Sequence, residues 1–210
     1  MKVKRIVNVL FFLVGTVILS FGIGCIITSH FGTSSWDAVS VALYKDLGLS
    51  IGFWLNSVAV ALICIGGVLL KKRPRFSTLI TSLVLGGGLD FWIWALKDIN
   101  CSSWLSSAGV FLVGILIMGL GIAIYLVSGL PPNPLDHFML CIHERFNLSI
   151  AKARTLSEAI GFLIGFILGG PIGIGTFVIL FFAGPIIQFY LKYTTKFYDF
   201  IIKRSQSLHH

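Results

Sequence analysis

The sequence predicts an all-α polytopic membrane protein with six transmembrane helices. We expect two inverted repeats of three spans, each with one short extra helix. Hydrophobic residues make up 56% of the 210 residues, charged residues only 11%, and the mean hydropathy is +0.95. Several apolar runs reach the length that crosses a bilayer as a helix, which is about 20 residues. An offset of 99 residues also superimposes the first half of the chain on the second.

The predicted spans follow one another along the chain with short connections. They are Ile6–Ser29, Ile51–Leu70, Phe76–Leu96, Trp104–Ser128, Ala151–Leu168 and Ile172–Leu191. If the chain starts in the cytoplasm and crosses six times, Lys45 and Lys97 are the only two of the 16 Lys and Arg residues outside cytoplasmic segments. The positive-inside rule therefore predicts that both termini are cytoplasmic. We interpret the net charge of +8 as contact with anionic lipids on the cytoplasmic side, and not with nucleic acid.

The internal repeat predicts how the halves are related. "FLVG" at Phe12–Gly15 returns at Phe111–Gly114, and Asp37 returns as Asp136. Because each copy holds three spans, the second copy enters the bilayer with the opposite orientation. We assign residues 1–100 to the first repeat, residues 101–192 to the second, and residues 193–210 to a basic amphipathic cytoplasmic tail in which His209-His210 is interpreted as a tag remnant.

One short helix is predicted in each repeat, at residues 35–47 and 134–146. Both segments are apolar, but they are too short to span a bilayer. They are either interfacial or re-entrant, and the sequence leaves both alternatives open.

The starts of these short helices carry matching polar residues. Ser34 and Asn133 are good N-caps, and Pro134 suits the first helical position. Asp37 and Asp136 then fall at the third helical position, where a carboxylate can bond back to the cap and favours the positive helix end. The aspartates are therefore either structural caps or paired gates that contact a solute, and one residue can serve both roles.

Polar residues inside the predicted spans are further candidates for a solute or ion pathway. Glu158 lies four residues after Arg154, so the two either form a structural ion pair or belong to a solute- or proton-coupling site. Asp90 is either part of a pathway or solvated near the outer surface. Because a one-residue gap reduces the offset to 98 in the third span of each copy, its repeat mate is Gln188. We predict a wet pocket lined by Asn56, Asp90, Glu158 and Gln188.

Catalytic chemistry has no support in the sequence. The four cysteines are scattered, without a CxxC pair or metal-ligand spacing, and no Ser/His/Asp or Cys/His arrangement indicates a nucleophile. We expect no enzyme activity, no metal and no cofactor. The glycines at 161, 165 and 169 form a small-residue stripe that predicts close helix packing, and "GGPIGIGT" at Gly169–Thr176 predicts a tight hairpin.

The segments "SSWDAVSVALYKDLGLSIG" and "PLDHFMLCIHERFNLSIAKARTLSEAIGFLIGFILGGPIGIGTFVILFFAGPIIQ" resemble the YczE/YyaS/YitT-type bacterial integral membrane proteins. The resemblance extends from about Phe11 to Phe189. It implies a small multi-pass protein of the bacterial cytoplasmic (inner) membrane, and it implies no particular activity. Two differences between the repeats bear on a symmetric site: "KKRPRFST" in the first copy replaces the glycine-rich hairpin, and Ala59 stands where the second copy has Glu158.

Inverted repeats recur in secondary transporters, so the leading hypothesis is a small transporter or exporter of a polar or amphipathic solute. The alternatives are a non-catalytic membrane subunit that binds a solute or lipid and depends on a partner protein, and a lipid scramblase. The sequence does not distinguish a homo-oligomer from a complex with a membrane partner.

Overall fold

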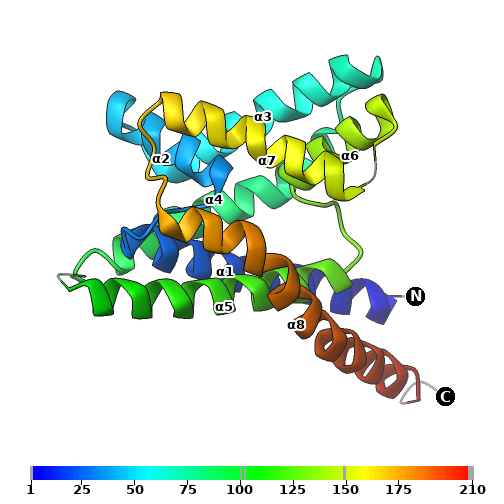
Figure 1. Cartoon of the computed structure of the whole chain (residues 1–210). Coiled ribbons are helices and arrows are strands. Elements are labelled where there is room, and N and C mark those ends of the chain that lie inside the picture. Colours follow the sequence, from blue (N-terminus) through cyan, green and yellow to red (C-terminus); the bar gives the residue numbers. More distant parts are fainter. Residues whose placement is uncertain (1, 100, 102, 149, 208–210) are drawn as a thin grey trace.

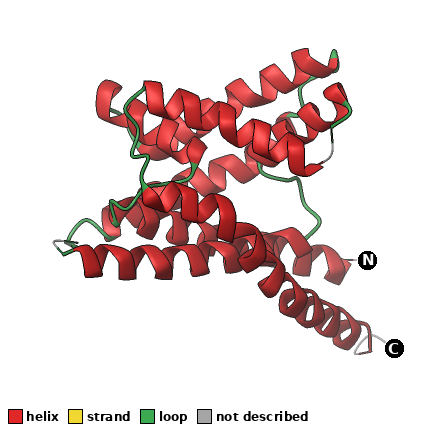
Figure 2. Ribbon diagram, viewed as in Figure 1, coloured by secondary structure: helices red, strands yellow, loops and turns green. Residues whose placement is uncertain are grey.

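The computed structural model describes residues 2–99, 101, 103–148 and 150–207, and these residues form only helices and loops (Figure 2). The predicted tag remnant at His209-His210 lies outside the described residues. In chain order the elements are α1 (Lys2–Thr28), α2 (Ser35–Leu47), α3 (Ile51–Leu70), the 3₁₀ turn η1 (Phe76–Thr78), α4 (Leu79–Ala95), α5 (Trp104–Val127), α6 (Pro134–Phe146), α7 (Ile150–Ile167) and α8 (Ile174–Ser207).

Five stretches of the described chain are long and apolar enough to cross a membrane. They are α1, α3, η1 with α4, α5 and α8. The predicted fifth span, α7, is not among them. Its first half contains Lys152, Arg154 and Glu158, and such charged groups are costly in hydrocarbon.

The last helix differs from the prediction. We expected a span that ended at Leu191 and a separate amphipathic tail, but α8 is one continuous helix of 34 residues. Pro185 lies inside α8 without ending it. At about 1.5 Å per residue such a helix is about 50 Å long, well beyond a bilayer core of about 30 Å. The C-terminal part of α8 therefore extends beyond the rest of the bundle (Figure 1).

Helices α1 and α5 form the central pair, and they pack in antiparallel orientation through glycines (Figure 1). The carbonyl oxygen of Gly121 lies 2.9 Å from the place that a Cβ on Gly15 would occupy, and the carbonyl oxygen of Gly114 lies at the same distance from that place on Gly22. Without side chains at these positions the two backbones come into direct contact. Helix α4 packs against α1, and α8 packs against α5.

The short helices pack against helices of the other half. Helix α2 lies against α7 as well as α3, and α6 lies against α3 as well as α7. The Trp36 ring of α2 covers Gly161 of α7, and the Cys141 sulfur of α6 covers Gly66 of α3. The predicted small-residue stripe on α7 is thus a packing face at Gly161, whereas Gly169 forms the turn after α7, with a positive φ of 67°.

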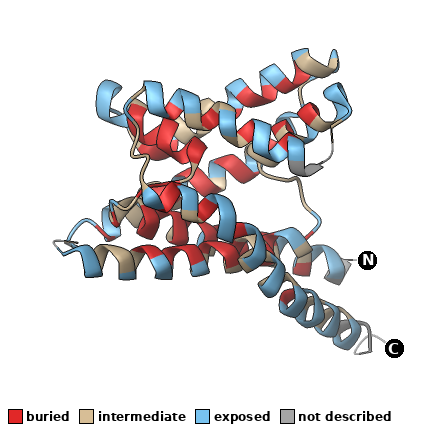
Figure 3. Ribbon diagram, in the orientation of Figure 1, coloured by how far each residue is buried: buried red, intermediate tan, exposed pale blue. Residues whose placement is uncertain are grey.

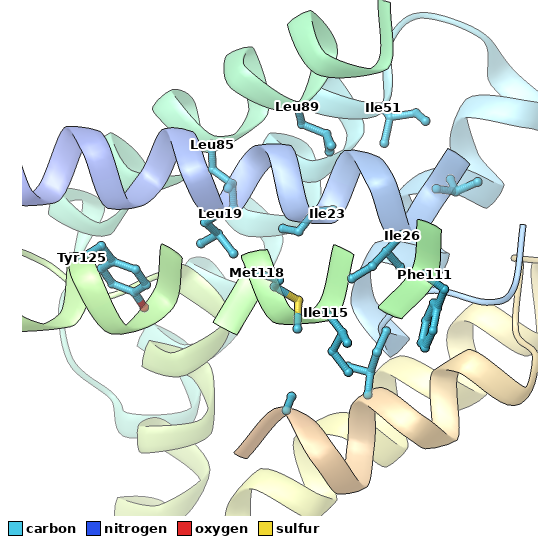
Figure 4. Packing of buried hydrophobic residues seen from close by; sticks show 13 residues of the cluster. Leu19, Ile23, Ile26, Ile51, Leu85, Leu89, Phe111, Ile115, Met118 and Tyr125 are labelled. Carbon is cyan, nitrogen blue, oxygen red and sulfur yellow. The ribbon is translucent and has the colours of Figure 1, made fainter. Parts of the chain in front are cut away.

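Two clusters of buried apolar residues hold these layers together. In the larger cluster, Leu19 and Ile23 of α1 lie between Leu85 of α4 and Met118 of α5 (Figure 4). The smaller cluster joins α2, α3, α6 and α7 around Trp36 and Phe138. Buried residues gather where the helices face one another, and exposed residues cover the outer surfaces, above all on α8 (Figure 3). A cavity lies between the two clusters and is lined by members of both.

Candidate functional site

The candidate site is this cavity, which has a volume of about 120 Å³. Most of its lining consists of residues that the 99-residue offset relates to one another. These pairs are Leu19 and Met118, Ile23 and Ile122, Ser34 and Asn133, Trp36 and Leu135, Asp37 and Asp136, Leu55 and Arg154, and Ala59 and Glu158. Positions that the offset relates therefore meet around one cavity.

Both short helices begin at this cavity and run away from it. Residues 35–42 of α2 are buried and residues 44–47 are exposed, and α6 likewise becomes exposed from residue 144 onwards. Their predicted caps are confirmed: the Ser34 hydroxyl accepts from the Asp37 N–H, and the Asn133 side chain accepts from the Leu135 N–H. The positive ends of two helix dipoles thus point toward one space, which favours negative groups there.

Three carboxylates meet these helix ends. Asp37 is buried and its Oδ2 accepts a 2.6 Å hydrogen bond from the Ser34 hydroxyl. The Tyr125 hydroxyl donates to Asp136 Oδ2 at 3.1 Å. The side chain of Ser35 hydrogen-bonds to Glu158, whose charge also acts on Asp37. Helices α2, α5, α6 and α7 therefore all supply polar groups to the cavity.

Arg154 is the basic residue in the cavity lining. Among the described residues no ion pair within 4 Å joins Arg154 to Glu158. The Arg154 charge instead acts on Asp136 and Tyr125 as well as on Glu158. One guanidinium is therefore shared among acidic groups from two helices, which leaves the cavity with more acidic than basic groups.

One buried donor at the cavity wall has no acceptor. Trp36 is only 5% exposed, and its indole Nε1 has no hydrogen-bond partner in the part of the chain that the structure describes. Buried donors are nearly always paired in folded proteins, so an orphan donor calls for an explanation.

The predicted pocket of Asn56, Asp90, Glu158 and Gln188 is not formed. Only Glu158 lines the cavity, and Gln188 is exposed on α8. Asn56 accepts a 2.7 Å hydrogen bond from the Ser82 hydroxyl, which joins α3 to α4.

Asp90 has a structural role at the start of α3. It accepts hydrogen bonds from the Ser50 hydroxyl at 2.5 Å and from the Gly52 N–H at 2.7 Å. These bonds tie α4 to the first turn of α3, a contact between residues about 40 positions apart that local sequence rules do not predict.

Asp90→Ala is expected to lower the free energy of unfolding by about 1–3 kcal/mol, because it leaves two donors at the start of α3 without their acceptor. Chemical denaturation in detergent measures this loss. Asp98→Ala, which removes an exposed carboxylate just beyond α4, is the control and should change stability little. Equal effects of the two variants would contradict the capping role.

The acidity of Asp37 predicts a pH dependence of stability. Burial, together with the nearby Glu158 charge, raises the pKa of Asp37 from 3.8 to about 6, against the opposing Ser34 hydrogen bond. Since the folded state holds the proton more tightly, the free energy of unfolding is highest below about pH 4. It should fall by up to about 3 kcal/mol as the pH rises to about 6, and level off above that.

Thermal unfolding of Asp37→Asn across this pH range checks the prediction. The variant should have a flatter profile than the parent protein, whereas Asp46→Asn, which changes an exposed carboxylate of the same helix, should keep the parent slope. Burial also raises the pKa of Asp136, so a residual slope of the same sign is expected in Asp37→Asn.

Sequence reasoning placed Ser34, Asp37, Asn133, Asp136, Arg154 and Glu158 among the candidate residues, and all six line the cavity. Pro134 is buried at the first position of α6, where a proline favours the start of a helix. Reasoning from sequence missed Tyr125 and Trp36. The repeat offset pairs Trp36 with the apolar Leu135, and nothing local in the sequence marks either Trp36 or Tyr125 as a cavity residue. Among the described residues no cluster of His, Cys, Asp and Glu is suited to a metal ion.

Comparison with known proteins identifies the family. A family described as "Family of unknown function (DUF6198)" matches residues 5–192. The chain belongs to this family. Proteins similar to it include YyaS of Bacillus subtilis, which is 36% identical over 179 residues, or 85% of this chain and 89% of YyaS. These matches confirm the expected YczE/YyaS type.

Two further relatives cover most of the chain. The membrane protein YczE of Bacillus subtilis is 26% identical over 205 residues, or 97% of this chain and 94% of YczE. A Haemophilus influenzae protein is 34% identical over 178 residues, or 83% of this chain and 79% of its own length. No solved structure matches. The apolar helices and the YczE relative together identify this DUF6198 chain as a membrane protein.

Proposed function

We propose that this DUF6198 protein is a small secondary transporter or exporter of a polar or amphipathic solute. The observation that supports this most is a cavity lined by equivalent residues of both halves, at which two short helices begin. Secondary transporters with inverted repeats bind their substrates in this way, near the repeat interface and at helix starts inside the membrane.

The proposed topology has six spans, with α7 as the fifth, in a bacterial cytoplasmic membrane with both termini in the cytoplasm. The charges of α7 argue against a lipid-facing span, but the partly buried Glu158 and the exposed Arg154 both line the cavity, and a span that borders a cavity can carry such groups. The inverted orientation of the halves is supported by the antiparallel pair α1 and α5 and by the reciprocal packing of α2 on α7 and α6 on α3.

The cavity groups are suited to a solute with both donors and acceptors. Asp37, Asp136 and Glu158 can accept hydrogen bonds from it, and the Arg154 guanidinium can donate. In the proposed mechanism, the α1–α5 pair stays together through its glycines. Rocking of α2 with α7 relative to α6 with α3 opens the cavity first to one side and then to the other.

The test is solute movement in vesicles that contain the purified protein. A panel of labelled amines, amino acids, sugars and organic acids is compared with empty liposomes of the same lipid. Flux of at least one class above that background supports the proposal. If none of the panel moves while a labelled lipid changes leaflet, the protein is a scramblase, and co-purification with a second subunit from native membrane would indicate the partner-dependent alternative.

A further inference from the structure

A second, larger pocket lies at the C-terminal end of α3. It has a volume of about 480 Å³ and is bounded by the end of α3, the loop of residues 71–75 and one face of α6. This loop connects two apolar helices that are each long enough to cross a membrane, so it lies at a membrane surface. The pocket is separate from the central cavity and shares no lining residue with it.

The loop backbone is held in a defined conformation. Lys71 ends α3 in the left-handed region with φ 53°, and the Lys72 N–H donates to Gly67 O at 3.0 Å. Pro74 folds back so closely that its Cγ lies 2.9 Å from the place a Cβ on Gly67 would occupy. The Thr78 hydroxyl donates to Arg75 O at 2.9 Å on the other side of the loop. The basic side chains therefore project from a fixed turn.

The charges around the pocket are mostly positive. Lys72 pairs with Glu144 of α6, which offsets one of the loop's cations. Arg73 and Arg75 also line the pocket. Burial, together with the Arg75 charge, lowers the pKa of His137. The His137 imidazole is therefore neutral at pH 7, and a neutral imidazole has one donor and one acceptor nitrogen. Two guanidinium groups beside a neutral imidazole are well suited to a phosphate.

The equivalent place in the other half is closed. There, Gly165 of α7 and Gly170 of the α7–α8 connection pack onto Ala38 of α2, with Ala38 O only 2.5 Å from the place of a Cβ on Gly170. The repeat offset relates Gly165 to Gly66 and Ala38 to His137. Replacement of a glycine hairpin by a basic loop, and of Ala by His, thus turns a sealed contact into an open, positively charged pocket.

We propose that this pocket binds the phosphodiester headgroup of an anionic lipid from the adjoining leaflet, with Arg73 and Arg75 as its main ligands. The position of the loop between two apolar helices places these guanidinium groups at headgroup level, where each basic residue adds attraction to an anionic lipid. This binding does not depend on transport through the central cavity.

The test is thermal unfolding of the full chain in detergent, titrated with short-chain phosphatidylglycerol, short-chain phosphatidylcholine or inorganic phosphate. Phosphatidylglycerol should raise the unfolding temperature and phosphatidylcholine should not, because a ligand of the folded state stabilises it by mass action. The double variant Arg73→Gln/Arg75→Gln should bind phosphatidylglycerol about 30-fold more weakly, which is about five-fold per arginine.

Lys196→Gln/Lys203→Gln, which removes two basic residues of α8 away from the pocket, is the matched control and should keep the full shift. Both pairs of residues are on the protein surface, so neither variant should unfold the protein. If both double variants lose the shift equally, general surface charge binds the lipid and the proposal is overturned. If inorganic phosphate reproduces the whole shift at similar concentrations, the pocket is a site for free anions and the lipid assignment fails.

Discussion

Gly121→Ala is expected to destabilise the protein by about 3 kcal/mol or more, the upper end of typical overpacking costs. A Cβ on Gly121 would lie 2.4 Å from the Leu19 backbone nitrogen and 2.9 Å from the Gly15 carbonyl oxygen. Both neighbours are backbone atoms of α1 that cannot rotate away, so α1 and α5 must separate. Separation also weakens the larger apolar cluster, in which both helices take part. Chemical denaturation in detergent measures the loss.

Gly109→Ala is the matched control on the same helix. Nothing lies within 4 Å of the position that its Cβ would occupy, and Gly109 is exposed. Alanine is the better helix former, so this variant should be neutral or more stable by up to about 1 kcal/mol. Similar stabilities of the two variants would show that α1 and α5 do not cross at these glycines.

Glu158→Gln is expected to abolish most of the solute flux measured in vesicles, or to weaken binding of the active solute by about 10- to 100-fold. The substitution keeps the shape of the side chain but replaces a charged acceptor by a neutral amide, and a hydrogen bond to a charged group contributes about 1.5–3 kcal/mol. It also leaves Arg154 with Asp136 as its main acidic neighbour in the cavity.

Glu144→Gln provides the control for Glu158→Gln. Glu144 and Glu158 are the two glutamates of the chain, and Glu144 forms an exposed pair with Lys72 outside the central cavity. Loss of a solvent-exposed ion pair has little effect on stability, so flux should stay near the parent value. Unchanged flux in Glu158→Gln, with unfolding temperatures matching the parent protein, would remove Glu158 from the proposed site.

The helix starts show how far local rules extend. Ser34 and Asn133 cap α2 and α6 as predicted, and Pro134 occupies the first position of α6. These features depend on residues within one turn of each other, so the sequence is sufficient to place them. The same local rules failed for Asp90, whose partners lie in a different helix.

The predicted pocket shows where reasoning from single spans fails. Asn56, Asp90 and Glu158 are all polar residues of apolar helices, and hydropathy alone treats them alike. The structure separates them because α3 packs directly on α4, which pairs Asn56 with Ser82, while α7 packs on α2, which brings Glu158 to Ser35. Asp90 lies near the start of α3, away from the part of α3 that lines the cavity, and Asn56 faces α4, so of the three only Glu158 lines it.

By itself, the sequence determined the all-helical membrane fold, the helix limits to within a few residues at most ends, and the caps at Ser34 and Asn133. Those properties follow from composition, periodicity and interactions within a turn. Only the tertiary structure decided that the short helices start inside the molecule and that they pack on the opposite half. It also decided that Tyr125 and Trp36 line the same cavity as the charged residues. The reason is physical: these contacts depend on how closely glycine-containing backbones approach one another, which no single helix determines.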